Sequence, residues 1–249
     1  MYKSPRSLRS RYVDFEIELP ESYNFLEEFS YCDFGPINQE CGCCYAYGPL
    51  KAMSHRICRA IGKQILLSAQ YLVACDLLDL GCEGGCARST LYFLEQQGVT
   101  DITCHPWQNI TLFSPDFCSK CQNPNISKEE QPKMHLYRSV YGSLRQLSTS
   151  DEIKKEIYLK GPVVASVATD DKMRYYRGGI YTRPHLNFSV PVAHTLEIIG
   201  WGKEKDIEYW IGYNSYGNDW GDNGTIKIRM GYNDAFIESF VYASDPENV

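Results

Sequence analysis

The hydrophobic and polar positions follow different periods in the two halves of the chain. Residues 44 to about 100 are predicted to be helical: residues 45–60 form a run of mixed periodicity, and Ala87, Leu91 and Leu94 follow helical spacing. Ser68 is a typical N-cap, and Gly98 is typical of the position that follows a last helical turn. The pattern therefore predicts three helices, over residues 45–60, 68–74 and 87–97.

Residues 101–135 have the composition of a long loop, because they contain four prolines and three cysteines. Thr149 and Glu152 have the spacing of a capping box. This signal predicts one further helix, which Gly161 and Pro162 end.

Beyond residue 162 the pattern changes to short apolar or alternating runs that are separated by turn residues. These runs predict five strands: Val163–Ala168, Thr195–Gly200, Glu208–Tyr213, Thr225–Met230 and Ile237–Ala243. Helices followed by strands are typical of an α+β fold. We expect a helical lobe and an antiparallel β lobe, with a binding site in the cleft between them.

Composition and charge narrow the possible functions. The chain has 249 residues, 43% of them hydrophobic and 22% charged, which is ordinary for one large domain or two closely packed lobes. The net charge of −6 does not favour a nucleic-acid partner or an anionic membrane. No apolar run approaches the ~20 residues of a membrane span.

The cysteine content is unusual, because the chain has eleven. So many cysteines favour an oxidising compartment, and an odd number leaves at least one thiol without an intramolecular partner. Residues 1–18 are basic and then acidic, and they lack the apolar core of a secretory signal. We interpret them as an N-terminal extension or the remnant of a removed pro-segment, with the signal upstream.

Three residues together indicate thiol chemistry. Cys44 opens the first predicted helix, where the helix dipole and unpaired N–H groups favour a thiolate. His194 lies at the start of one predicted strand, and Asn214 follows the end of the next. A thiol nucleophile, an imidazole and an amide that orients the imidazole are the groups that acyl transfer requires.

Around these residues the chain resembles the papain-like cysteine peptidases, and within them the cathepsin B-like branch. The resemblance extends over about residues 19–245 and rests on these motifs: Cys41-Gly42-Cys43-Cys44-Tyr45, Leu19-Pro20, Asn38-Gln39, His55-Arg56-Ile57-Cys58, Leu67-Ser68-Ala69-Gln70, Gly81-Cys82-Glu83-Gly84-Gly85, Gly200-Trp201-Gly202 and Trp220-Gly221-Asp222-Asn223-Gly224.

The resemblance implies a two-lobe fold, with a helical left lobe, an antiparallel β-barrel-like right lobe and the active site in the cleft between them. The peptidase domain would be residues 19–249. Its helical lobe would cover about residues 38–137, and its β lobe about residues 138–249 together with residues 19–37.

The resemblance also implies catalytic roles. Cys44 would be the nucleophile, His194 its base and acid, and Asn214 the group that orients the imidazole. Gln39 is the residue we expect to donate to the oxyanion, although an ungapped alignment would place Asn38 there.

Eight residues are expected to contact the substrate. Gly84 and Gly85 would pair with the extended peptide through their backbone. Phe240 would form the floor of the S2 pocket, which predicts small or medium apolar P2 residues and poor use of arginine. The remaining members are Gly42, Cys86, Ala87, Thr195 and Trp220. The segment from Cys104 to Cys121 has no adjacent pair of histidines, so we expect an endopeptidase and not a carboxydipeptidase.

The resemblance further implies four disulfides: Cys32–Cys58, Cys41–Cys82, Cys75–Cys118 and Cys104–Cys121. Cys43 and Cys86 remain, and an extra bond between them beside the cleft is one hypothesis. Zinc binding by Cys104, Cys118 and Cys121 together with His105 is the alternative to the disulfides of these three cysteines.

Four departures from the family pattern concern activity: Tyr45, Pro49, Ala193 and Tyr216. Pro49 removes a backbone hydrogen bond from the nucleophile helix and can kink it. The leading interpretation is nonetheless a cysteine endopeptidase, and the alternative is a catalytically weak relative that binds peptides or proteins.

No cofactor is implied, and the expected partners are peptide or protein substrates and cystatin-like or pro-segment inhibitors of a monomer. A lysosomal, vacuolar or secreted location is expected, with glycosylation sequons at Asn109, Asn125, Asn187 and Asn223. A surface or structural role is expected for His55, His135 and His185.

Overall fold

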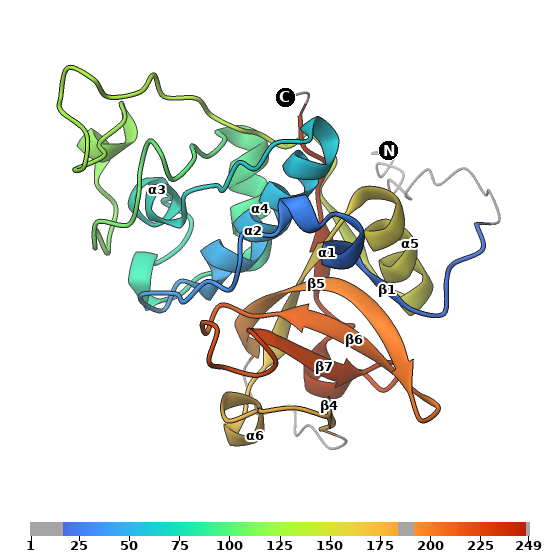
Figure 1. The fold of residues 1–249 in the computed structure, drawn as a ribbon. Helices are drawn as coiled ribbons and strands as arrows, with labels where there is room; N and C mark the ends of the chain where they lie inside the picture. Colours follow the sequence, from blue (N-terminus) through green and yellow to red (C-terminus); the bar gives the residue numbers. More distant parts are fainter. Residues whose placement is uncertain (1–16, 184–191, 248–249) are drawn as a thin grey trace, which may run out of the picture.

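The computed structural model describes residues 17–183 and 192–247 (Figure 1). His185, Asn187 and nearly all of the expected N-terminal extension lie outside the described residues. The chain forms the expected α+β arrangement, with most strands in one lobe and three of the helices in the other (Figure 1). Helices α5 (Ser150–Lys160) and α6 (Asp171–Arg174) lie with the strands. No helix within the described ranges is long and apolar enough to cross a membrane.

Three helices build the helical lobe, as the hydrophobic period predicts. They are α2 (Cys44–Ile61), α3 (Ala69–Cys75) and α4 (Ala87–Gln96). The Ser68 hydroxyl accepts from the Tyr71 N–H at 2.9 Å, which caps α3, and Gly98 follows α4 with a left-handed φ of +84°. The short elements of this part of the chain are α1 (Phe25–Glu28), η1 (Ser30–Cys32), η2 (Gly81–Glu83) and η3 (Pro115–Cys118).

The strands form one sheet in the order β2-β8-β3-β5-β6-β7-β4, with β1 paired to β5. Their bounds are β1 (Tyr23–Asn24), β2 (Arg145–Leu147), β3 (Val163–Ala168), β4 (Ile180–Tyr181), β5 (Val192–Glu204), β6 (Ile207–Tyr213), β7 (Thr225–Arg229) and β8 (Val241–Ala243). Neighbouring strands among the described residues pair antiparallel, except β4 and β7, which are parallel. The described sheet has two end strands, β2 and β4, so it is not closed into a barrel.

One predicted strand is only partly correct, because residues 237–240 form a turn after η4 (Asp234–Phe236). The Glu238 carboxylate accepts hydrogen bonds from the backbone N–H groups of Gly231 and Asn233 and from the Trp210 indole. These bonds fold the backbone back on itself, and pairing begins only at Val241.

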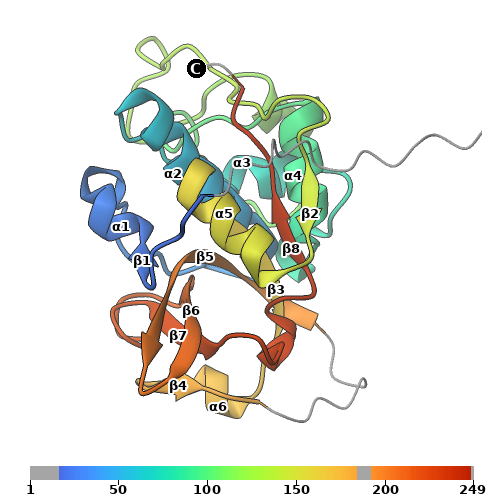
Figure 2. The same ribbon diagram turned by 90° about the vertical axis from the view of Figure 1, so that its right-hand side faces the viewer.

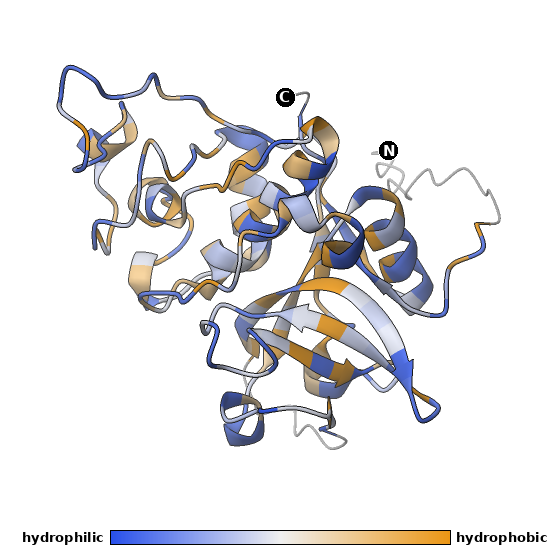
Figure 3. Ribbon diagram, in the orientation of Figure 1, coloured by the Kyte–Doolittle hydropathy of each residue, from blue (hydrophilic) through white to orange (hydrophobic). Residues whose placement is uncertain are grey.

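Helix α5 (Ser150–Lys160) starts at the predicted capping box and ends at Gly161. It packs on the sheet, and Figure 2 shows β8 and β2 running beside α4 and so joining the two lobes. A buried ion pair between Arg56 on α2 and Glu156 on α5, 2.9 Å apart, fixes the two helices together. Hydrophilic residues concentrate at the surface, for example at the tip of the β5–β6 hairpin (Figure 3).

Candidate active site

A cavity of about 680 Å³ lies between the lobes and contains most of the predicted site residues. Its predicted members are Gln39, Gly42, Cys44, Gly84, Gly85, Cys86, His194, Thr195 and Phe240. Six further lining residues were not predicted to contact substrate: Glu83, Ser166, Val192, Ala193, Tyr216 and Tyr242.

Cys44 is the first residue of α2, so its thiol sits at the positive end of the helix dipole. The sulfur lies 4.0 Å from the carbonyl oxygen of Ala193, across the cleft from α2. Burial raises the pKa of the Cys44 thiol, and backbone hydrogen bonds from Thr195 and Tyr45 act in the opposite direction. A thiolate at this position therefore needs a cation beside it.

His194 is buried and is held by one strong hydrogen bond. Its Nε2 lies 2.7 Å from Oδ1 of Asn214, and the same oxygen accepts the backbone N–H of Ser215 at 2.8 Å. Since Oδ1 can only accept, Nε2 carries the proton and Nδ1 is the nitrogen that can take a second one. Burial lowers the pKa of His194 to about 4, while the Asn214 bond acts to raise it.

Tyr216 covers the imidazole, with the two ring centroids 4.6 Å apart. Trp220 lies behind Tyr216 in an edge-to-face contact, 5.5 Å between centroids, and its indole donates to the carbonyl of Arg174 at 2.9 Å. Trp220 is therefore outside the lining of the cleft, where it was expected to contact substrate. The observed order, with tyrosine on the imidazole and tryptophan behind it, keeps water from the His194–Asn214 bond.

Gln39 and not Asn38 lines the cleft. The Gln39 side chain accepts from the Ser215 hydroxyl at 2.7 Å and donates to the Cys41 carbonyl at 2.7 Å. Asn38 instead forms a backbone bridge with Tyr216. The side-chain amide of Gln39 is thus held beside the nucleophile loop by two bonds.

The opposite wall is a tight loop from Glu83 to Cys86. The Leu80 N–H donates to the Gly84 carbonyl at 2.9 Å, and Gly84 has a φ of +117°, which residues with a side chain rarely adopt. The Asp79 carboxylate accepts from the Cys86 N–H at 2.9 Å. This loop presents exposed backbone groups to the cleft.

The inner end of the cleft combines Phe240, Thr195, Ser166 and Tyr242. Phe240 is 39% exposed, so its ring is accessible to a ligand. Ala87, which was also expected here, is buried and lies outside the lining. The alternation of β8 is a sequence signal that indicates Tyr242, because its neighbours Val241 and Ala243 both face the core.

Pro49 does not break the nucleophile helix, although it lies inside α2. A residue at this position would normally donate its N–H to the carbonyl of Tyr45, one turn earlier. The Thr90 hydroxyl on α4 donates to that carbonyl instead, at 2.8 Å. Helix α2 therefore continues unbroken past Pro49, from Cys44 to Ile61.

The structure contains the four disulfides that the resemblance implies: Cys32–Cys58, Cys41–Cys82, Cys75–Cys118 and Cys104–Cys121. The zinc alternative is wrong, because the sulfurs it requires are in these bonds and are not thiolates. The hypothesis of a Cys43–Cys86 bond is also wrong, because both thiols are free. Cys43 is buried under the cleft and Cys86 is exposed within it.

Comparison with known proteins agrees with this geometry. The model of the papain family cysteine proteases matches residues 19–244. Cathepsin B-like cysteine proteinase 1 of Ostertagia ostertagi is 33% identical over 89% of this chain and 71% of its own length. Cathepsin B-like CP2 of Giardia intestinalis is 30% identical over 91% of this chain and 74% of its own.

A solved structure shows the same fold. The procathepsin B S9 of Trypanosoma congolense superposes with a TM-score of 0.79 at 26% identity, covering 94% of this chain and 80% of the other. A cleft with a thiol at a helix N-terminus, opposite an amide-bound imidazole, defines a cysteine hydrolase. The chain belongs to the papain family of cysteine proteases and is a cathepsin B-like member of it.

Proposed function

We propose that the chain is an endopeptidase in which Cys44 attacks the peptide carbonyl and His194 transfers the protons. The observation that carries this proposal is the 2.7 Å bond between His194 Nε2 and Asn214 in the cleft that also holds Cys44. Burial disfavours the charge on each partner separately, and the proposed ion pair supplies the opposite charge that thiolate and imidazolium each need.

In this mechanism the Cys44 sulfur bonds to the carbonyl carbon, and the carbonyl oxygen becomes an oxyanion. The backbone N–H of Cys44 and the side-chain amide of Gln39 stabilise that charge. The imidazolium of His194 gives its proton to the leaving amine as the C–N bond breaks, which leaves a thioester. Water then attacks the thioester while His194 removes its proton, and the thiolate is released.

The ring of Phe240 supports a preference for small or medium apolar P2 residues. It lies with Thr195 and Tyr242 at one end of the cleft. Among the described residues of the lining, Glu83 is the one carboxylate, and it lies on the opposite wall, so none of them beside Phe240 is an acidic group that can pair with a basic side chain. A fluorogenic P2 library should therefore show poor cleavage of substrates that have arginine at P2. Phe240→Glu should improve arginine relative to leucine, and a wild-type preference for P2 arginine would contradict the proposal.

Endopeptidase action is supported by the Cys104–Cys121 segment. Its histidine, His105, is fully buried, and Nε2 is bonded to the Phe117 carbonyl at 2.9 Å. This imidazole cannot reach a substrate carboxylate in the cleft. An N-blocked peptide should be cut internally at the same rate with a free or an amidated C-terminus, whereas sequential release of C-terminal dipeptides would refute this part of the proposal.

The decisive experiment is stoichiometric titration with a peptidyl epoxide that alkylates thiols. One equivalent should abolish peptide hydrolysis, with the label on Cys44, and Cys44→Ala should be unlabelled. Cys86→Ser is the matched control, because it removes the other accessible thiol and should leave the stoichiometry unchanged. Labelling of Cys44 without turnover of any peptide would favour a peptide-binding role in place of catalysis.

We also propose that residues 19–249 act as one monomeric peptidase domain in a lysosomal, vacuolar or secreted location. Four disulfides and exposed sequon asparagines at positions 109, 125 and 223 support an oxidising, secretory route. The procathepsin B neighbour supports inhibition by a pro-segment, and cystatin-like inhibitors would bind the same cleft.

A further inference from the structure

A second, much smaller cavity lies beside Asn214, and neither Cys44 nor His194 belongs to its lining. Its volume is about 10 Å³, and its lining includes Asn214, Thr195, Glu197 and Lys51. Two buried side-chain atoms of this lining have no hydrogen-bond partner among the described residues: Nδ2 of Asn214 and Oε2 of Glu197.

These two atoms are chemically complementary. An amide N–H is a donor and a carboxylate oxygen is an acceptor, and buried atoms of both kinds are nearly always hydrogen-bonded. A water molecule needs about 10–15 Å³ of such space and several polar partners. The cavity volume of about 10 Å³ is at the lower end of this range, and its lining offers a donor, Nδ2, and an acceptor, Oε2, to one water.

The charge of Glu197 is set by groups on α2. Its other oxygen, Oε1, lies 2.6 Å from Nδ1 of His55, and both side chains are fully buried. Nε2 of His55, like the two atoms above, has no hydrogen-bond partner among the described residues. Within the buried pair, Nδ1 of His55 donates to a carboxylate oxygen of Glu197.

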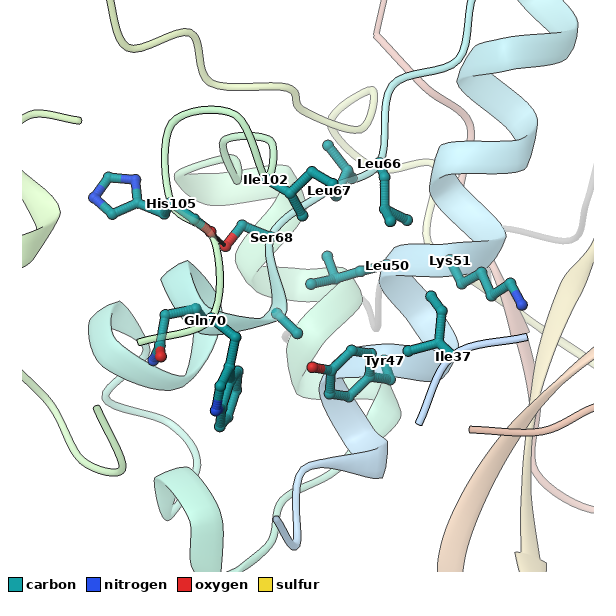
Figure 4. Close-up of a pocket in the computed structure, with 12 residues that line it drawn as sticks. Ile37, Tyr47, Leu50, Lys51, Leu66, Leu67, Ser68, Gln70, Ile102 and His105 are labelled. Atoms are coloured by element: carbon teal, nitrogen blue, oxygen red, sulfur yellow. Dashed lines mark hydrogen bonds between the residues drawn. The ribbon is translucent and has the colours of Figure 1, made fainter. Parts of the chain in front are cut away.

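Lys51 supplies the opposite charge. Its ammonium donates to the Gly35 carbonyl at 2.9 Å and lies 3.1 Å from the centroid of the Tyr213 ring. Lys51 also borders a separate apolar pocket of about 160 Å³ on the helical lobe, and Figure 4 shows its side chain leaving α2 toward the strands, away from His105. Asp33, which accepts from the Tyr213 hydroxyl at 3.4 Å, is a further charged group beside this cluster.

We propose that this cavity binds one water molecule between Glu197 and Asn214, and that Glu197 is thereby a positioning residue for the His194 imidazole. The water holds the Asn214 amide with its oxygen toward His194. The negative charge of Glu197 also polarises the water and the amide, so that Oδ1 accepts more strongly from the imidazolium. This inference deepens the peptidase proposal and rests on it.

The first test is Glu197→Gln, which keeps the size of the side chain and removes its charge. We expect kcat/KM to fall on the order of 10-fold, mainly through kcat, as for a group that orients a catalytic residue. The alkaline limb of the pH profile should move to lower pH, because the imidazolium is less stabilised. Asp234→Asn is the matched control: it neutralises a buried carboxylate bound by Arg229 in the β lobe and should leave that limb in place.

The second test asks whether Glu197 acts through Asn214. In an Asn214→Ala background, Glu197→Gln should have little further effect, since the group it positions is gone. An equal loss of kcat/KM in both backgrounds would overturn the proposal. So would a Glu197→Gln enzyme whose kcat/KM is within about 2-fold of wild type and whose alkaline limb does not move.

Two measurements need no peptide turnover and so separate this inference from the proposed function. A high-resolution crystal structure of the wild-type protein should show a water within hydrogen-bond distance of both Nδ2 and Oε2. Alkylation of Cys44 by iodoacetamide at mildly acidic pH, measured in Cys86→Ser, should slow in Glu197→Gln. An empty cavity, or an unchanged alkylation rate, would refute the inference even if the protein is an active peptidase. If the water is present and alkylation slows but no peptide is hydrolysed, only the peptidase proposal is refuted.

Discussion

Thr90 should be a stability determinant of the nucleophile helix, because it supplies the hydrogen bond that Pro49 cannot. Thr90→Val keeps the shape of the side chain and leaves the Tyr45 carbonyl without this donor. Thr90 is fully buried and Tyr45 is 1% exposed, so water cannot replace the hydroxyl without opening the contact between α2 and α4.

An unsatisfied buried acceptor of this kind costs about 1–3 kcal/mol. We expect a loss of about 2 kcal/mol in the free energy of unfolding, which for a chain of this size corresponds to a fall in Tm of about 4–8 °C. Denaturant titration and thermal scans of the Cys44→Ala protein, which prevents self-cleavage, would measure both quantities.

Two controls make the reasoning refutable. Thr100 is a second fully buried threonine, but its hydroxyl has no hydrogen-bond partner within residues 17–183 and 192–247, so Thr100→Val should be close to neutral. Pro49→Ala restores a backbone N–H for the Tyr45 carbonyl, so Thr90→Val should cost at least about 1 kcal/mol less in that background. Equal losses with proline and alanine at position 49 would show that the hydroxyl does not compensate for the proline.

Two further predictions concern buried charge. In Cys44→Ala, NMR should show His194 titrating near its lowered pKa of about 4. Between about pH 6.5 and that value the unfolded chain binds more protons than the folded protein, so the free energy of unfolding should fall as the pH drops through this window. A midpoint at 6.5 or above would contradict the burial argument. Arg56→Met should lower the free energy of unfolding by about 3–5 kcal/mol, because it leaves the buried Glu156 carboxylate without one of its two arginines. A loss under about 1 kcal/mol, measured by denaturant titration, would show that this ion pair is dispensable.

The sequence predicts the helices better than the strands, and the reason is the range of the signals. Ser68 and the Thr149–Glu152 box bond to their own helices within three residues, so the caps can be read locally. The two-residue strands β1 and β4 carry no alternation that could be recognised. They are strands only because they pair with β5 and β7, which are remote in the sequence.

The cleft shows the same division. Cys44, His194 and Asn214 are recognisable from residue type and motif, and the structure brings their side chains to one place. Ala87 and Trp220 were expected to contact the substrate, but neither lines the cleft. Ala87 is buried at the start of α4, and Tyr216 lies between Trp220 and the imidazole. Sequence motifs locate the backbone of a site, whereas the lining depends on which side chain each element turns toward it.

The polar residues of α2 show what a sequence contains beyond the hydrophobic period. Lys51, His55 and Arg56 are all buried, so the helix is enclosed on every side and a pattern of apolar positions alone could not identify its partners. Glu197 is the corresponding anomaly in β5, a charged residue in an apolar run. Each such residue requires a partner, because an unpaired buried charge is too costly to retain. The anomalies are therefore visible in the sequence before the fold is known. Only the packing of α2 against β5 shows that His55 and Glu197 pair with one another, beside the residue that orients the catalytic imidazole.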